Sequence, residues 1–110
     1  MRRKSQNVKF DGIHPVMVMP LFRMDEWWRR TLGFEMTITS CIDGRHSPTS
    51  RHYIGTAVDL RTWDSPDSGR QIQEPHRSDL LRKFIKYLGR DWFVIDEGDH
   101  WHVDYRPRRD

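Results

Sequence analysis

The residues from Glu97 to Tyr105 read EGDHWHVDY, and the alternation within this stretch decides how the C-terminal part of the chain folds. Successive side chains of a β-strand point to opposite faces. One face of a strand over residues 100–105 would be polar, with His100, His102 and Asp104, and the other apolar, with Trp101, Val103 and Tyr105. The segment therefore predicts a strand with its apolar face in a core and its polar face towards a cleft.

The residues before this strand predict its partner. Residues 92–95, WFVI, are apolar, and residues 96–99, DEGD, have the composition of a turn. Two extended segments joined by so short a connection favour an antiparallel hairpin. Farther upstream, residues 56–61, TAVDLR, predict another strand, with Asp59 on its polar face.

Two helices are expected. Apolar side chains at near-helical spacing over residues 21–32 predict the first, with Pro20 near its start and Gly33 at its end. A second apolar stripe over residues 80–88 is followed by Gly89 and predicts the other helix.

The order of the elements indicates the fold class. Residues 35–39 alternate polar and apolar side chains and predict a strand, whereas residues 41–49 and 64–73 are expected to be loops. The resulting order is helix, strand, strand, helix, strand, strand. It predicts an α+β domain whose helices pack on a small antiparallel sheet.

Length and charge limit the organisation of the chain. At 110 residues, of which 35% are hydrophobic, it can form one domain with a modest core. We assign residues 1–12 to a basic lead-in and residues 13–110 to the domain. The net charge of +3 lies largely near the ends, in Arg2, Arg3, Lys4, Arg106, Arg108 and Arg109. We interpret these residues as solvated ends, with attraction to a phosphate-rich polymer, either nucleic acid or an anionic cell-wall polymer, as the alternative. No nucleic-acid motif is present, so no specific nucleic-acid partner is expected.

Redox and targeting signals are sparse. Cys41 is the only cysteine, so the chain forms no internal disulfide. The basic start is not followed by the apolar segment of a signal peptide, and no apolar run approaches the ~20 residues that span a bilayer. We therefore expect no membrane insertion and synthesis in the cytoplasm. Action on a substrate outside the membrane would then require delivery of the protein.

Three separated residues fit the ligand set of one zinc ion. His52 and Asp59 lie in residues 50–60, SRHYIGTAVDL, and His102 lies in the last strand. Two imidazoles and one carboxylate leave a fourth tetrahedral position open, which distinguishes a catalytic zinc site from a closed structural one. The mixture of nitrogen and oxygen donors argues against calcium and magnesium, which prefer oxygen ligands alone.

These two segments resemble the signature of the zinc D-Ala-D-Ala carboxypeptidase family, whose fold is shared with lysostaphin-type peptidases and the hedgehog signalling domain. The family pattern Ser-x-His-x-x-Gly-x-Ala-x-Asp is met by Ser50, His52, Gly55, Ala57 and Asp59. An acidic residue and a Trp-His strand follow later, at Asp99 and residues 101–102. Small phage-encoded members also share features of residues 38–40, 43–46 and 97–102. The similarity covers roughly residues 20–107.

The resemblance implies a hedgehog/D-Ala-D-Ala peptidase-like fold and roles for the matching residues. His52, Asp59 and His102 would hold one Zn2+ ion, and His100 is the alternative to His102. The family's catalytic carboxylate lies three residues before the last ligand, which selects Asp99.

Further roles follow from the same resemblance. Glu97 rivals Asp99 as the catalytic carboxylate, since it lies three residues before His100. His100 itself would hydrogen-bond the oxyanion if His102 is the ligand. Ser50 and an upstream arginine would hold the substrate; Asp43 occupies the place near the family's arginine, and we expect Arg45 to substitute.

The implied function is that of a zinc metallopeptidase acting on the stem peptide of peptidoglycan. It would hydrolyse an amide bond next to a D-amino acid, as a D,D-carboxypeptidase or an endopeptidase, and in a bacteriophage it could serve as an endolysin or a virion-associated hydrolase. We expect a monomer. A non-catalytic zinc-binding interaction module of the same fold is the alternative. The sequence leaves open the scissile bond, the host and the metal used in the cell.

Overall fold

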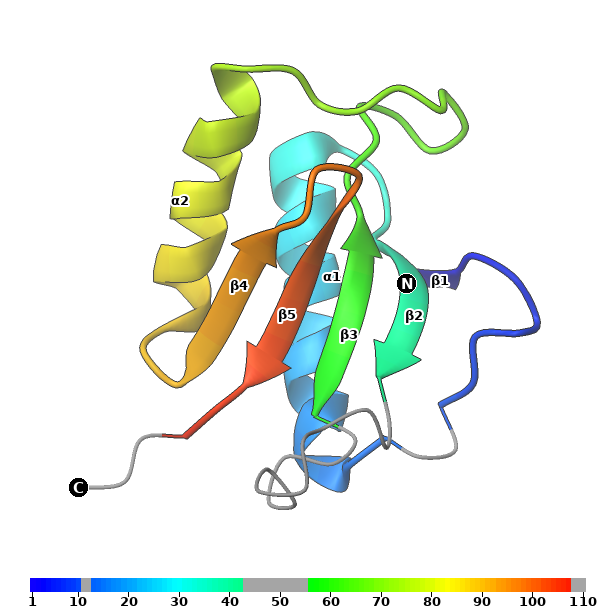
Figure 1. The fold of residues 1–110 in the computed structure, drawn as a ribbon, viewed down its shortest axis with the longest axis vertical. Coiled ribbons are helices and arrows are strands. Elements are labelled where there is room, and N and C mark those ends of the chain that lie inside the picture. Colours follow the sequence, from blue (N-terminus) through cyan, green and yellow to red (C-terminus); the bar gives the residue numbers. More distant parts are fainter. Residues whose placement is uncertain (11–12, 43–55, 108–110) are drawn as a thin grey trace.

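The computed structural model describes residues 1–10, 13–42 and 56–107, which form an α+β fold in two layers (Figure 1). Its elements in chain order are β1 (Arg2–Arg3), the 3-10 helix η1 (Pro15–Met17), α1 (Val18–Leu32), β2 (Thr37–Ile42), β3 (Ala57–Arg61), α2 (His76–Leu88), β4 (Trp92–Asp96) and β5 (His100–Tyr105). The strands form a five-stranded sheet in the order β1-β2-β3-β5-β4. The α+β class is therefore confirmed.

The sheet is mixed rather than antiparallel. The pairs β2–β3, β3–β5 and β5–β4 are antiparallel, as predicted, whereas β1 pairs in parallel with β2. The prediction of a purely antiparallel sheet is wrong at this edge because β1 comes from the supposed basic lead-in. Its pairing uses the backbone: the N–H groups of Arg2 and Lys4 donate to the carbonyl oxygens of Met36 and Ile38, each at 2.8 Å. Charged side chains give no alternation that would reveal such a strand.

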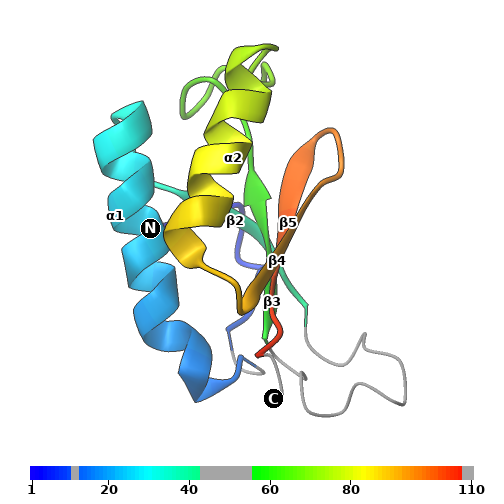
Figure 2. The same ribbon diagram turned by 90° about the vertical axis from the view of Figure 1, so that its left-hand side faces the viewer.

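Both α-helices lie on the same side of the sheet (Figure 2). α1 ends at Gly33, whose φ of 88° is the left-handed conformation that glycine adopts without a steric penalty. The core between the layers contains the aromatic side chains of Trp28, Phe84 and Trp101, all at most 1% exposed. Trp28 meets Trp101 edge to face, with ring centroids 5.5 Å apart. Neither α-helix in the described residues is long and apolar enough to cross a membrane.

Both predicted loops differ from the structure. Residues 41–49 are not a loop throughout, because Cys41 and Ile42 continue β2 and pair with β3. The expected surface loop over residues 64–73 is partly internal, since Ile72 is only 3% exposed. Local composition signals turns, but it does not show which loop residue reaches the core.

The strands therefore have two different faces. Val58 and Leu60 of β3 and Trp101 and Val103 of β5 are completely buried against the helices. The alternate residues point to the opposite face, on which the described residues place no helix. We call this surface the open face. It carries the polar side chains that the sequence singles out.

Candidate metal and catalytic site

Asp59 and His102 are direct neighbours at the centre of the open face. They occupy paired positions on β3 and β5, and His102 Nδ1 lies 2.9 Å from Asp59 Oδ1. Two ligands about 2.0–2.1 Å from a tetrahedral zinc ion lie roughly 3.3 Å from each other. The spacing suits a direct Asp–His hydrogen bond and is close to that of two donors to one ion. Residues far apart in the sequence thus meet on this face.

The second ring nitrogen of His102 faces another carboxylate. Nε2 lies 4.0 Å from Oδ2 of Asp104, a residue that is 3% exposed. That oxygen accepts a hydrogen bond from Arg106 Nε at 3.0 Å, while Asp104 Oδ1 is buried without a hydrogen-bond partner in the described part of the chain. A carboxylate behind an imidazole is the usual device that orients a metal-binding histidine. Asp59 and His102 are donors of the kinds that zinc takes, and Asp104 lies near the second ring nitrogen of His102 without a direct hydrogen bond to it.

The carboxylates around His102 give the site a negative electrostatic potential. The hydrogen bond to Asp59 is the largest cause that raises the pKa of His102, and burial opposes it. The charges of Asp59, Asp104 and Glu97 raise this pKa further. The same field that favours a proton on the imidazole favours a bound cation.

His100 occupies the next paired position on the open face, opposite Arg61. Its Nε2 lies 3.7 Å from Asp59 Oδ2, and its Nδ1 lies 2.5 Å from Asp99 Oδ1. The Asp59 carboxylate thus has one imidazole near each oxygen, with His102 the nearer. The choice between His100 and His102 as the third ligand stays a prediction.

The two candidate acids lie at the turn between β4 and β5. Gly98 has a φ of 96° at the first central position of this turn, where a tight hairpin favours glycine. Asp99 is 80% exposed at its side chain, and its hydrogen bond to His100 lowers its pKa. The backbone N–H of Glu97 donates to the carbonyl of His100 at 2.9 Å. Strand alternation from Ile95, the partner of His102, places Glu97 on the open face.

A β-bulge in β2 lies beside Asp59. Ile38 pairs with Leu60, but the next pair is Ser40 with Asp59, so Thr39 is the extra residue. Thr39 Oγ1 donates to the backbone carbonyl of Asp59 at 3.3 Å. Bulges occur preferentially next to active sites, where they redirect side chains. The alternation of residues 35–39 gives no sign of the irregularity.

Asp104 and Arg106 are the site residues to which the sequence interpretation gave no role. Alternation along β5 places Asp104 on the polar face, but only the fold shows its burial behind His102. Arg106, which the sequence predicts to lie in a solvated end, has a side chain that is 52% exposed and donates a hydrogen bond to Asp104. Its guanidinium carbon lies 4.6 Å from the centroid of the Phe93 ring.

Three of the predicted site residues, His52, Ser50 and Arg45, lie outside the described residues. Within residues 1–10, 13–42 and 56–107, no group of three or more His, Cys, Asp or Glu side chains is arranged to hold a metal ion. The predicted triad includes His52, so it stays a prediction. No family model, curated protein or solved structure matches the chain.

Proposed function

We propose that this chain is a zinc-dependent peptidoglycan peptidase that hydrolyses an amide bond next to a D-amino acid. The observation that carries the proposal is the contact of Asp59 with His102 on the open face, with buried Asp104 behind the imidazole. In the family motif, Asp59 follows His52 by seven positions, and His102 lies in the Trp-His strand. Chain segments 43 residues apart thus converge on one point.

His52, Asp59 and His102 would hold the ion. A bound zinc ion supplies a Lewis acid, which polarises the scissile carbonyl and lowers the pKa of the attacking water. Asp104 would keep the His102 ring in the orientation that presents Nδ1 to the site. The hydrogen bond from Thr39 to the backbone of Asp59 would fix the position of that strand.

The remaining polar groups would transfer protons and stabilise the negative charge of the transition state. Asp99 or Glu97 would take a proton from water and pass it to the leaving amine, a general acid–base role. His100 would donate a hydrogen bond to the oxygen that becomes negative in the transition state. Its contact with Asp99 holds the ring with Nε2 towards Asp59.

The test compares zinc content and activity in the native protein and in His102→Ala. We expect one zinc per native chain and release of D-Ala, or of a cross-linked fragment, from purified muropeptides. His102→Ala should bind zinc at least tenfold more weakly and release no product above background. His76→Ala is the matched control, because His76 is exposed at the start of α2 and should leave both results unchanged.

The outcomes separate the proposal from its alternative. Zinc bound in a His102-dependent way without hydrolysis of any muropeptide would identify a non-catalytic zinc-binding module. Zinc binding that His102→Ala and Asp59→Asn leave unchanged would remove the proposed site altogether.

A further inference from the structure

A hollow of about 340 Å³ lies on the open face directly beside His100. Lys4, Arg61, Trp63, Gln71, Asp99 and His100 are among its lining residues. Its sole lining carboxylate among these described residues, Asp99, is already engaged by His100. The hollow therefore joins two cations to the candidate catalytic groups.

Arg61 is held in place by packing rather than by a counter-ion. It ends β3, and its guanidinium carbon lies 3.7 Å from the centroid of the Trp63 ring. Stacking on an aromatic face leaves the edge N–H groups of a guanidinium available to a carboxylate. Burial lowers the pKa of Arg61, and the charge of Arg2 lowers it further. Asp67, whose charge partly offsets this, is paired with Arg2.

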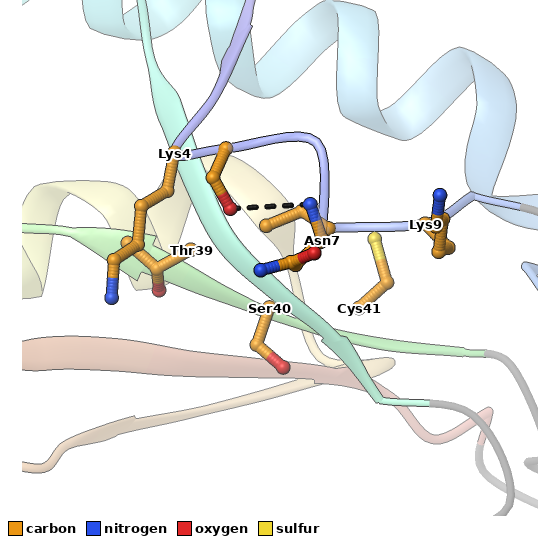
Figure 3. Close-up of a pocket in the computed structure, with 8 residues that line it drawn as sticks. Lys4, Asn7, Lys9, Thr39, Ser40 and Cys41 are labelled. Carbon is orange, nitrogen blue, oxygen red and sulfur yellow. Dashed lines mark hydrogen bonds between the residues drawn. The ribbon is translucent and has the colours of Figure 1, made fainter.

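Lys4 brings a second positive charge to the rim. Its backbone N–H donates to Ile38 at 2.8 Å, which anchors this residue beside β2. Figure 3 shows its side chain next to Thr39 at one end of an adjoining hollow of about 440 Å³, with Lys9 at the other end. Neither Lys4 nor Arg61 forms an ion pair in the described part of the chain.

Hydrogen bonds fix Gln71, another residue that lines the hollow. Gln71 Nε2 donates to the carbonyl of Asp99 at 3.1 Å, and Gln71 Oε1 accepts from Arg77 at 3.0 Å and from Thr62 at 2.5 Å. These bonds join the end of β3, α2 and the β4–β5 turn. A rigid hollow with unpaired cations loses little entropy when an anion enters it.

We propose that this hollow is a carboxylate-binding subsite in which Arg61 and Lys4 recognise a carboxylate of the peptide substrate. The inference rests on the proposed function and extends it, because it assigns substrate-binding residues other than Ser50 and Arg45.

The spacing along the strands limits where that carboxylate lies in the substrate. The pair Arg61 and His100 is two residues from the pair Asp59 and His102, which is about 7 Å along a strand. One substrate residue spans about 3.5 Å, and a guanidinium and a carboxylate in contact account for most of the remainder. A carboxylate one residue beyond the cleaved amide reaches Arg61. This matches the free C-terminus on which a carboxypeptidase acts.

The binding experiment is independent of turnover. D-alanine and D-alaninamide, which differ in the carboxylate, are titrated into the zinc-loaded protein while the Trp63 indole resonance is followed by NMR. We expect D-alanine to shift this resonance and D-alaninamide to leave it in place. In Arg61→Gln the response to D-alanine should weaken about ten- to a hundredfold, the usual effect of losing a charge-assisted hydrogen bond.

The kinetic experiment identifies the source of the carboxylate. Stem peptides are compared with a free or amidated C-terminus, and separately with D-glutamate or D-isoglutamine inside the peptide. For Arg61→Gln we expect KM to rise about ten- to a hundredfold with a smaller change in kcat, and Arg61→Lys to recover part of the loss. If amidation of the C-terminus raises KM in the native protein but not in Arg61→Gln, the hollow binds the terminal carboxylate. If only the exchange of D-glutamate for D-isoglutamine has this effect, the hollow binds the carboxylate inside the peptide.

Arg70→Gln is the matched control, since Arg70 is 77% exposed and pairs with Asp64 outside the hollow. The Arg61→Gln variant must first have the melting temperature of the native protein. The subsite is overturned if this variant then binds D-alanine, and cleaves peptides, as well as Arg70→Gln does. If no peptide is cleaved but D-alanine still binds through Arg61, the subsite stands and the proposed peptidase function falls.

Discussion

Asp104 has the least ordinary environment of the site residues. It is a buried carboxylate with one oxygen bound to Arg106 and the other without a hydrogen-bond partner among the described residues. Leaving such a group unpaired costs free energy, so its presence calls for a compensating role. Orientation of the His102 ring is the role that its position supports.

Asp104→Asn should therefore weaken zinc binding without removing a ligand. We expect a loss of about ten- to a hundredfold in zinc affinity, the usual effect of losing a carboxylate behind a metal-binding histidine. Competition with a chromogenic chelator measures it. Asp79→Asn, on the exposed side of α2, is the control and should keep the native affinity. Equal affinities for the two variants would show that Asp104 does not serve the metal.

The two candidate acids are separated by the response of kcat. If Asp99 is the general base, Asp99→Asn lowers kcat by about a hundredfold or more while Glu97→Gln has a small effect, and the reverse holds if Glu97 is the base. Asp99 is exposed, and its hydrogen bond to His100 lowers its pKa, which makes it a weaker proton acceptor than a free aspartate side chain. Steady-state release of D-Ala from a stem peptide measures both. Near-native kcat in both variants would contradict general-base hydrolysis at this turn.

Among the elements, α2 is joined to the β4–β5 turn by an ion pair of two parallel hydrogen bonds. Arg77, 7% exposed, donates from Nε and Nη2 to the two oxygens of Asp96, each at 2.7 Å. Gly98 N–H donates to the same carboxylate at 2.9 Å. The hydrogen bonds from Arg77 are the largest cause that lowers the pKa of Asp96, against the opposing effect of burial.

The stability of the fold should consequently depend on acid pH through Asp96. Because its folded pKa lies below the unfolded value of about 3.9, the contribution is complete above that value and is lost as pH falls through the folded pKa. Asp96→Asn should lower the free energy of unfolding at pH 7 by on the order of 2 kcal/mol. Urea unfolding at pH 7 and pH 3 measures the difference from the native protein, which should shrink at the lower pH.

The control for this measurement is Asp67→Asn, since Asp67 is 81% exposed and its ion pair with Arg2 contributes little. A deficit in Asp96→Asn that is the same at pH 3 as at pH 7 would contradict the assigned ion pair.

The sequence predicts the elements better than their edges. Strand β5 has the predicted bounds, residues 100–105, because alternation and the preceding turn agree there. The ends of both helices at Gly33 and Gly89 follow from the special backbone of glycine. β1 and the extension of β2 are stabilised by backbone pairing with distant segments. The local pattern of side chains does not predict that pairing.

At the scale of the whole molecule, the described residues divide into a covered core and an open face that carries the candidate site. Asp59, His102 and His100 belong to strands that also supply Val58, Leu60 and other completely buried residues. Alternation predicts that these polar residues share a face, but their mutual contacts depend on the pairing register, which the sequence does not encode locally. The hollow at Arg61 arises from chain segments that meet only in the fold.

If the proposed ligands hold zinc, binding should stabilise the entire fold, because Asp59 and His102 belong to separate strands of one sheet. At a free concentration of about 100 times Kd, binding to the native state alone adds about 2.7 kcal/mol. For a domain of this size that raises the melting temperature by on the order of 10 °C. Thermal unfolding followed by circular dichroism, with zinc and with a chelator, measures the shift. His102→Ala should show almost none; an equal shift in this variant would place the stabilising ion elsewhere.

The pairing of β3 with β5 also constrains how this gene can diverge. Side chains alternate between the two faces at every step, so loss or gain of one codon inside β5 would turn Trp101 outward and bury His102 in its place. Point substitutions on the helices face no such penalty. Among descendants of this chain, length variation should therefore accumulate in the connecting segments and be purged from these two strands.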